Sequence, residues 1–177
     1  MDALPSSAHH RDASATLRRT LGLDVGDYCT GVALSEPMGL LARSLVVIQS
    51  RRWAVQVAQI ADLVIHHEVG TIVLGYPLHM SGEAGEQARR VDRFADLLAE
   101  ELARRGWSAE VAFWDERFTT EIAEDIRRQN LSQRGARSGG RAGRGARVDA
   151  TAAAVILQSY LDHLLSRRVS EAPGQSV

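Results

Sequence analysis

The apolar positions of the chain recur with two different periods, and the changes of period divide it into strands and helices. Short β-branched or alternating runs, typical of strands, occur at 21–25, 30–34, 45–48, 71–74 and 110–114. Apolar residues at helical spacing occur at 53–69, 83–105, 119–129 and 148–166. Gly70 and Gly106 follow the first two helical segments, and we expect them to end those helices.

The order of these segments predicts an α/β fold. The first three strands are joined by short connections, so we expect them to be antiparallel, with a hairpin turn at Gly26-Asp27. Later strands are separated by helices, and strands joined by such crossovers are parallel. The pattern therefore predicts a five-stranded mixed sheet, its first three strands antiparallel, with helices on both faces.

Three segments lack this periodicity. Residues 1–19 and 167–177 are polar, and we expect them to be disordered tails on either side of one domain at 20–166. Within that domain, residues 131–147 hold five arginines, five glycines and no acid. Glycine supplies flexibility and arginine pairs with phosphate, so this loop is either a mobile arm that binds a polyanion or a solvated linker.

Composition narrows the possible chemistry. The 177 residues carry a net charge of -1, so no overall positive field attracts nucleic acid. All 21 basic residues are arginine, which excludes every mechanism that needs a lysine. The single cysteine, Cys29, cannot form an intrachain disulfide, and no apolar run approaches the ~18 residues of a membrane span. We therefore expect a cytoplasmic protein with no membrane partner.

Three carboxylates stand where the predicted fold can bring them together. Asp24 interrupts the first apolar strand, Glu116 follows the strand at 110–114, and Asp149 begins an otherwise small or apolar helix. A lone aspartate in a strand is more often structural than catalytic. If the first strand is central and the last parallel strand lies near it, however, the apolar helix would bring Asp149 to the other two.

Such a cluster requires protons or cations. Two unit charges ~4 Å apart repel by about 4 kcal/mol at an effective dielectric near 20. Oxygen ligands suit Mg²⁺ or Mn²⁺, and open coordination positions would accept phosphate oxygens. Two ions roughly 3.5–4 Å apart could activate water and stabilise the leaving oxygen of a phosphodiester. The carboxylates therefore predict a two-metal site.

Four ordered motifs carry a family resemblance. They are Leu21-Gly-Leu-Asp-Val-Gly26, Ile72-Val-Leu-Gly-Tyr-Pro-Leu-His-Met-Ser-Gly82, Asp115-Glu-Arg-Phe-Thr-Thr120 and the segment that begins at Val148-Asp-Ala. Together they resemble the YqgF/RuvX family of RNase H-like nucleases. The resemblance implies an RNase H-like fold, metal-dependent phosphodiester hydrolysis, and maturation of the 5′ end of pre-16S rRNA, free or on the ribosome. Holliday-junction resolution is the other activity that the resemblance implies.

The resemblance places the catalytic and metal-binding acids at Asp24, Glu116 and Asp149, the same three residues. We expect His79, Arg117, Arg144 and Arg147 to contact the nucleic acid, although Arg117 could equally form a structural ion pair. One departure concerns the first motif, because Cys29-Thr30 stands where the family commonly has Arg-Ile. A cation near the site is thereby lost, which puts substrate affinity in question.

Other functions remain open at this point. Gly-Leu-Asp-Val-Gly also resembles the phosphate-binding hairpin of sugar-kinase-like ATPases, but the chain has length for one such subdomain only. A non-catalytic factor that binds RNA or the ribosome is a further alternative. Metal-bound carboxylates would hydrolyse RNA or branched DNA alike. A resolvase of branched DNA would act as a dimer, and the sequence predicts a monomer or a weak homodimer.

Overall fold

The computed structural model describes residues 18–77, 85–115 and 144–171, and in the last of these ranges it describes side chains from residue 152 onward, Val169 and Glu171 excepted. The helix predicted at 119–129 lies outside the described residues. The elements in chain order are β1 (Arg19–Val25), β2 (Cys29–Ser35), β3 (Ala42–Gln49), α1 (Trp53–His66), β4 (Val69–Tyr76), α2 (Glu86–Arg104), β5 (Glu110–Asp115) and α4 (Arg144–Glu171).

The five strands form one mixed sheet in the order β3-β2-β1-β4-β5. β1 pairs antiparallel with β2, and β2 pairs antiparallel with β3. On the other side, β1 pairs parallel with β4, and β4 pairs parallel with β5. The predicted five-stranded mixed sheet is therefore confirmed, and β1 is its central strand. β3, β1, β4 and β5 all run in the same direction, so their carboxyl ends lie at one edge.

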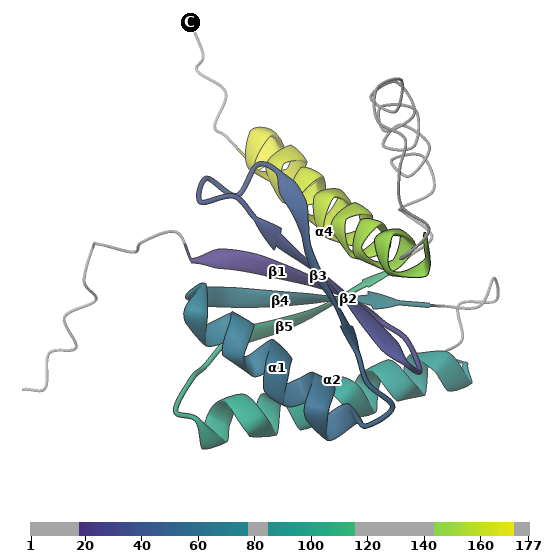
Figure 1. Ribbon diagram of the computed structural model, residues 1–177. Coiled ribbons are helices and arrows are strands. Elements are labelled where there is room, and N and C mark those ends of the chain that lie inside the picture. The colour runs from purple at the N-terminus through teal and green to yellow at the C-terminus, as the bar shows by residue number, and fades with distance from the viewer. Residues whose placement is uncertain (1–17, 78–84, 116–143, 172–177) are drawn as a thin grey trace, which may run out of the picture.

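Helices cover both faces of the sheet, as predicted. α1 and α2 lie side by side on one face, and α4 lies on the other (Figure 1). The face toward α1 and α2 buries the larger apolar core, which includes Leu21, Leu23, Phe94 and Leu98. The smaller core beneath α4 consists of small and aliphatic residues, namely Ala33, Val73, Ala153, Ala154, Ile156, Leu157 and Leu161.

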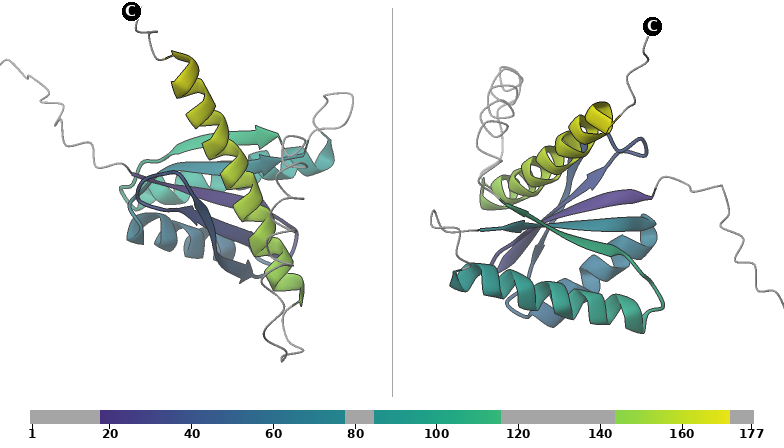
Figure 2. Two further views of the ribbon diagram at one scale, coloured as in Figure 1. Left: turned by 90° about the horizontal axis from the view of Figure 1, so that it is seen from above. Right: turned by 180° about the vertical axis from the view of Figure 1, so that it is seen from behind.

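α4 crosses the sheet obliquely, which Figure 2 shows from above and from behind. The closest approach lies at Gly22 in β1. A Cβ atom at Gly22 would stand 2.7 Å from the Leu157 Cβ and 2.9 Å from the Ala153 carbonyl oxygen. Both distances are shorter than van der Waals contact, so only a glycine permits this packing of α4 on β1.

The ends of two helices differ from the predictions. α1 ends at His66, and the chain turns at Glu68, whose φ of 53° is left-handed, so Gly70 is not the stop signal. Gly70 lies inside β4, where an added Cβ would stand 2.6 Å from the Arg18 Cβ. α4 begins at Arg144 and continues to Glu171. Residues 144–147, expected in the loop, and 167–171, expected in the tail, are therefore helical.

Ion pairs join the end of α2 to α1. The Arg105 guanidinium donates to the Asp62 carboxylate of α1, to the Ala58 carbonyl oxygen at 3.3 Å, and to Glu101 Oε1 at 2.6 Å. Arg104 also donates to Glu101, at 2.7 and 2.9 Å. These two guanidinium groups lower the pKa of Glu101 to about 2. Of the helices in the described part of the chain, none combines the length and the apolar character that crossing a bilayer requires.

We predict that Gly22→Ala destabilises the fold by about 1–3 kcal/mol, because the new methyl group meets a backbone oxygen and a Cβ that cannot move aside. The measurement is urea unfolding followed by circular dichroism. Gln49→Ala, at an exposed position of β3, is the control and should change the free energy of unfolding by less than about 0.5 kcal/mol. A Gly22→Ala protein as stable as wild type would contradict the close packing.

We also predict that Glu101 makes a pH-dependent contribution to the free energy of unfolding. Its pKa in the folded protein is about 2, below the ordinary value of 4.5, so its stabilising effect is complete above pH 4.5 and declines as pH falls toward 2. The difference in unfolding free energy between wild type and Glu101→Gln should therefore shrink over that range. Glu100→Gln, at the exposed neighbouring position, is the matched control variant. A constant difference for Glu101→Gln would refute the assignment.

Candidate active site

Asp24 is near the carboxyl end of the central strand and is half-buried. Side chains alternate along a strand, so Asp24 shares the face of Gly22, which is the face that α4 covers. Its antiparallel partner in β2 is Gly31. Directly opposed residues point to the same face, so the two nearest positions to Asp24 on this face, Gly22 and Gly31, carry no side chain. No side chain from these two positions crowds the carboxylate, and at Gly22 the space is taken by α4.

The carboxyl ends of the parallel strands lie beside Asp24. Leu23 is level with Leu74 in β4, and Leu74 is level with Phe113 in β5. β5 ends at Asp115, the residue before Glu116. β4 lies between β1 and β5, so the backbones of β1 and β5 are about 10 Å apart, two strand spacings. The sequence pattern predicts that the last parallel strand, β5, lies near the first strand, β1. In the structure β4 separates the two.

The first turns of α4 lie toward the same region. Ala153 and Leu157 of α4 contact β1 at Gly22. Position 149 is one helical turn before Ala153 and two turns before Leu157, so the three positions follow one stripe of the helix. The backbone of α4 thus carries position 149 past Gly22 in the direction of the helix N-terminus. The side chain of Asp149 is not among the described side chains.

The structure describes only part of the predicted site. Glu116, Arg117 and His79 lie outside the described residues. Arg144 and Arg147 are in the first turn of α4, where their side chains are likewise not described. Among the side chains that the structure does describe, no three histidines, cysteines, aspartates or glutamates are close enough to hold a metal ion. The convergence of Asp24, Glu116 and Asp149 therefore stays a prediction.

One buried polar network beside the site was not predicted from the sequence. The fully buried Thr30 hydroxyl of β2 donates to Gln56 Oε1 of α1 at 2.5 Å, and Gln56 Nε2 donates to the Ser50 carbonyl oxygen at 2.6 Å. Gln56 thus ties the β3–α1 connection to the sheet. The available signal was Gln56 itself, a polar residue beside Val57 and four residues before Ile60 on the apolar stripe of its helix.

Two further contacts fasten α2 at the same edge of the sheet. Arg90 forms an ion pair with Asp27 in the β1–β2 turn. The Tyr76 hydroxyl, at the end of β4, donates to Asp92 Oδ2 at 3.1 Å. Burial and then the hydrogen bond to Asp92 raise the pKa of Tyr76, so the phenol remains a neutral donor near pH 7. α2 is therefore held to the ends of two of the strands that form the site.

Comparison with known sequences gives consistent matches over most of the chain. A family model described as RuvX, Holliday junction resolvase, matches residues 18–163. A protein of Syntrophus aciditrophicus named "Putative pre-16S rRNA nuclease" is 40% identical over 151 residues, which cover 85% of this chain and 93% of that protein. A Clostridium botulinum protein of the same name is 38% identical over 147 residues, covering 82% and 98%.

Comparison with solved structures gives the same fold at low sequence identity. RuvC of T. thermophilus, solved in complex with a Holliday junction substrate, matches with a TM-score of 0.54 and 12% identity, covering 84% of this chain and 96% of that chain. The yeast mitochondrial Holliday junction resolvase Ydc2 matches with a TM-score of 0.54 and 12% identity, covering 86% and 81%. The expected RNase H-like fold is thereby confirmed.

We predict that Thr30→Val destabilises the protein by about 1–3 kcal/mol, because it leaves the buried Gln56 Oε1 without its donor. Adding Gln56→Leu should recover part of that loss, since the unpaired Oε1 is then gone, and the recovery is only partial because the Ser50 carbonyl oxygen loses its Nε2 donor. Urea unfolding of the two single variants and the double variant forms a double-mutant cycle. Strictly additive effects would show that the two side chains do not interact.

Proposed function

Because the chain belongs to the RuvX family of nucleases, we propose that it is a metal-dependent endonuclease that processes the 5′ end of pre-16S rRNA. The observation that carries the proposal is Asp24, a half-buried carboxylate on the central strand, beneath the helix that contains position 149. The name of the relatives at 38–40% identity supports the rRNA precursor as the substrate.

We assign the catalytic and metal-binding roles to Asp24, Glu116 and Asp149. A glutamate is one methylene longer than an aspartate, which suits a ligand supplied after β5, the more distant strand. Ala153 and Leu157 of α4 contact β1 at Gly22, which supports a role for position 149, one helical turn before Ala153. Three carboxylates in one place repel each other strongly, and divalent cations relieve this repulsion. Their oxygen atoms are suitable ligands for Mg²⁺ or Mn²⁺.

Bound divalent ions would supply an activated water and stabilise negative charge on the phosphodiester and its leaving oxygen. The contribution of the protein's own residues is to hold the metal ligands and the substrate in position. Asp24 is fixed by the central strand, and its partner across the β1–β2 pair, Gly31, has no side chain that would compete with a substrate backbone for space. α4 begins at this region with Arg144, and the positive end of its dipole favours a phosphate there.

A second candidate substrate is the Holliday junction, because the matching family model is described as a Holliday junction resolvase. The resolvase structures at 12% identity show the fold alone and do not favour DNA over RNA. The arginine-rich residues 131–147 would contact either polyanion. We favour RNA because the relatives of highest identity given above are named for pre-16S rRNA.

We predict that Asp24→Asn abolishes cleavage without lowering the stability of the fold. An asparagine keeps the shape of the side chain but loses the charge that a metal ligand needs, and relief of repulsion should hold stability constant or raise it. The measurement is Mg²⁺- and Mn²⁺-dependent cleavage of a 5′-extended 16S rRNA precursor and of a four-way DNA junction, in parallel. Asp96→Asn, at an exposed position of α2, is the matched control and should cleave like wild type.

The outcomes separate the candidate functions. Cleavage of the precursor that is lost only in Asp24→Asn supports the proposal, and faster cleavage of the junction would favour the resolvase. If wild type cleaves neither substrate but binds the precursor as tightly as the variant does, the protein is a non-catalytic RNA-binding factor. If Asp24→Asn unfolds, the aspartate has a structural role and the assignment is wrong.

A further inference from the structure

A groove opens at the same edge of the sheet as the candidate active site, on the face that α1 and α2 cover. It has a volume of about 390 Å³ and is lined by Val25, Gly26, Asp27, Trp53, Glu86, Gln87 and Arg90. Its walls are the β1–β2 turn, the start of α1 and the start of α2. The groove begins at the residue that follows Asp24, and its volume falls within the range of pockets that bind small organic groups.

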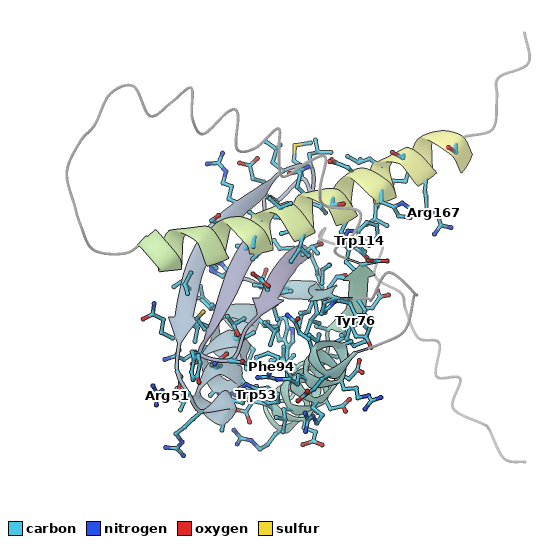
Figure 3. All side chains as sticks on the ribbon, turned by 90° about the vertical axis from the view of Figure 1, so that its right-hand side faces the viewer. Arg51, Trp53, Tyr76, Phe94, Trp114 and Arg167 are labelled. Atoms are coloured by element: carbon cyan, nitrogen blue, oxygen red, sulfur yellow. The ribbon has the colours of Figure 1, made fainter. Side chains whose placement is uncertain are left out.

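An exposed aromatic ring and an arginine lie next to this groove. Tyr28, in the β1–β2 turn after Asp27, is 64% exposed. The guanidinium carbon of Arg51 lies 5.3 Å from the centre of the Tyr28 ring. Arg52, the next residue in the sequence, is also exposed and directly precedes Trp53 of the groove wall. Figure 3 shows Arg51 and Trp53 close together, well away from Trp114 and Arg167.

The framework that carries these two groups is fixed by hydrogen bonds. The Ser50 backbone N–H donates to the Tyr28 carbonyl oxygen at 3.0 Å, which joins the β3–α1 connection to the turn. Gln56 Nε2 donates to the Ser50 carbonyl oxygen at 2.6 Å. Arg90 binds Asp27 and thereby fastens the turn to α2. The ring and the guanidinium are therefore presented on an ordered backbone.

The charges at this edge favour an anionic ligand. Asp27 is matched by Arg90, and the other carboxylate of the groove wall, Glu86, is outnumbered by Arg51 and Arg52. Within the described residues, Arg51 and Arg52 form no ion pair with a carboxylate. Two exposed guanidinium groups thus remain available beside an exposed aromatic ring. A planar ring that stacks and guanidinium groups that bind phosphate together match a nucleotide whose base is unpaired, because a base inside a duplex already stacks on its neighbours.

We propose that Tyr28, Arg51 and the adjoining groove bind an unpaired nucleotide of the substrate strand, at the same end of β1 as Asp24 but on the α1 and α2 side of the sheet. The proposed nuclease function supplies the position of the cleaved phosphate at Asp24. Asp24 is two residues before Gly26, or about 7 Å along the strand from the start of the turn, and its side chain is on the face that α4 covers. The substrate strand would therefore pass around the end of β1 between the cleaved phosphate and the bound nucleotide. The subsite would favour substrates that are single-stranded next to the cleaved bond.

The test measures binding without cleavage. Fluorescence anisotropy in EDTA gives the Kd of the full-length protein for a short single-stranded RNA and for an RNA duplex of the same length. We expect Tyr28→Ala to weaken single-strand binding roughly fivefold to a hundredfold, and Tyr28→Phe, which keeps the ring, to change it by less than about twofold. Arg51→Gln should weaken single-strand binding and reduce its salt dependence by about one phosphate contact. Arg168→Gln on α4 is the control, for which the Kd and its salt dependence should match those of wild type.

Duplex binding should be nearly unchanged by Tyr28→Ala. The proposal is overturned if Tyr28→Ala binds single strands like wild type, if it loses duplex affinity equally, or if Tyr28→Phe is as weak as Tyr28→Ala. Because EDTA removes catalysis, these results do not depend on whether the protein cleaves RNA. Failure of the proposed nuclease function would instead appear in the cleavage assay with Asp24→Asn.

Discussion

The close contact between β1 and α4 at Gly22 is the constraint on which the rest of the site depends. The helix backbone can approach the central strand because position 22 has no Cβ, and α4 packs there with alanines and Leu157. A larger residue in β1 would lift the helix from the sheet. That movement would also displace position 149, one turn before Ala153, from the strand that carries Asp24.

The sheet order sets the second constraint. Placing β1 at the centre gives Asp24 one antiparallel and one parallel neighbour, and the parallel strands β4 and β5 end at the same edge. This arrangement lets one helix face and two strand ends contribute to a single region. It also separates the backbones of β1 and β5 by about 10 Å, so the predicted ligands from these two strands would have to reach toward each other across β4. A site that holds ions between its ligands is compatible with such a spacing.

The sequence predicted the strands, the sheet and its antiparallel start because short apolar runs and turn residues are local signals. Asp24 was found because a charge inside an apolar strand is conspicuous. The position of β4 between β1 and β5 results from pairing between strands that are far apart in the sequence. Local patterns carry no information on such pairing. The end of α1 was misassigned because Glu68 takes the left-handed conformation usually held by glycine. The Thr30–Gln56 bond joins residues 26 positions apart, and no local pattern links them.

That hydrogen bond also bears on how the sequence can vary. Thr30 and Gln56 are both fully buried, and each satisfies a polar group of the other. A change to an apolar residue at either position alone leaves a fully buried polar side chain unpaired, whereas a paired change removes only the donor to the part-buried Ser50 carbonyl oxygen. The two positions should therefore covary among relatives, with threonine at 30 accompanied by a polar residue at 56 and an aliphatic residue at 30 by an apolar one. The composition of β2, the strand beside Asp24, is in this way tied to α1 on the opposite face of the sheet.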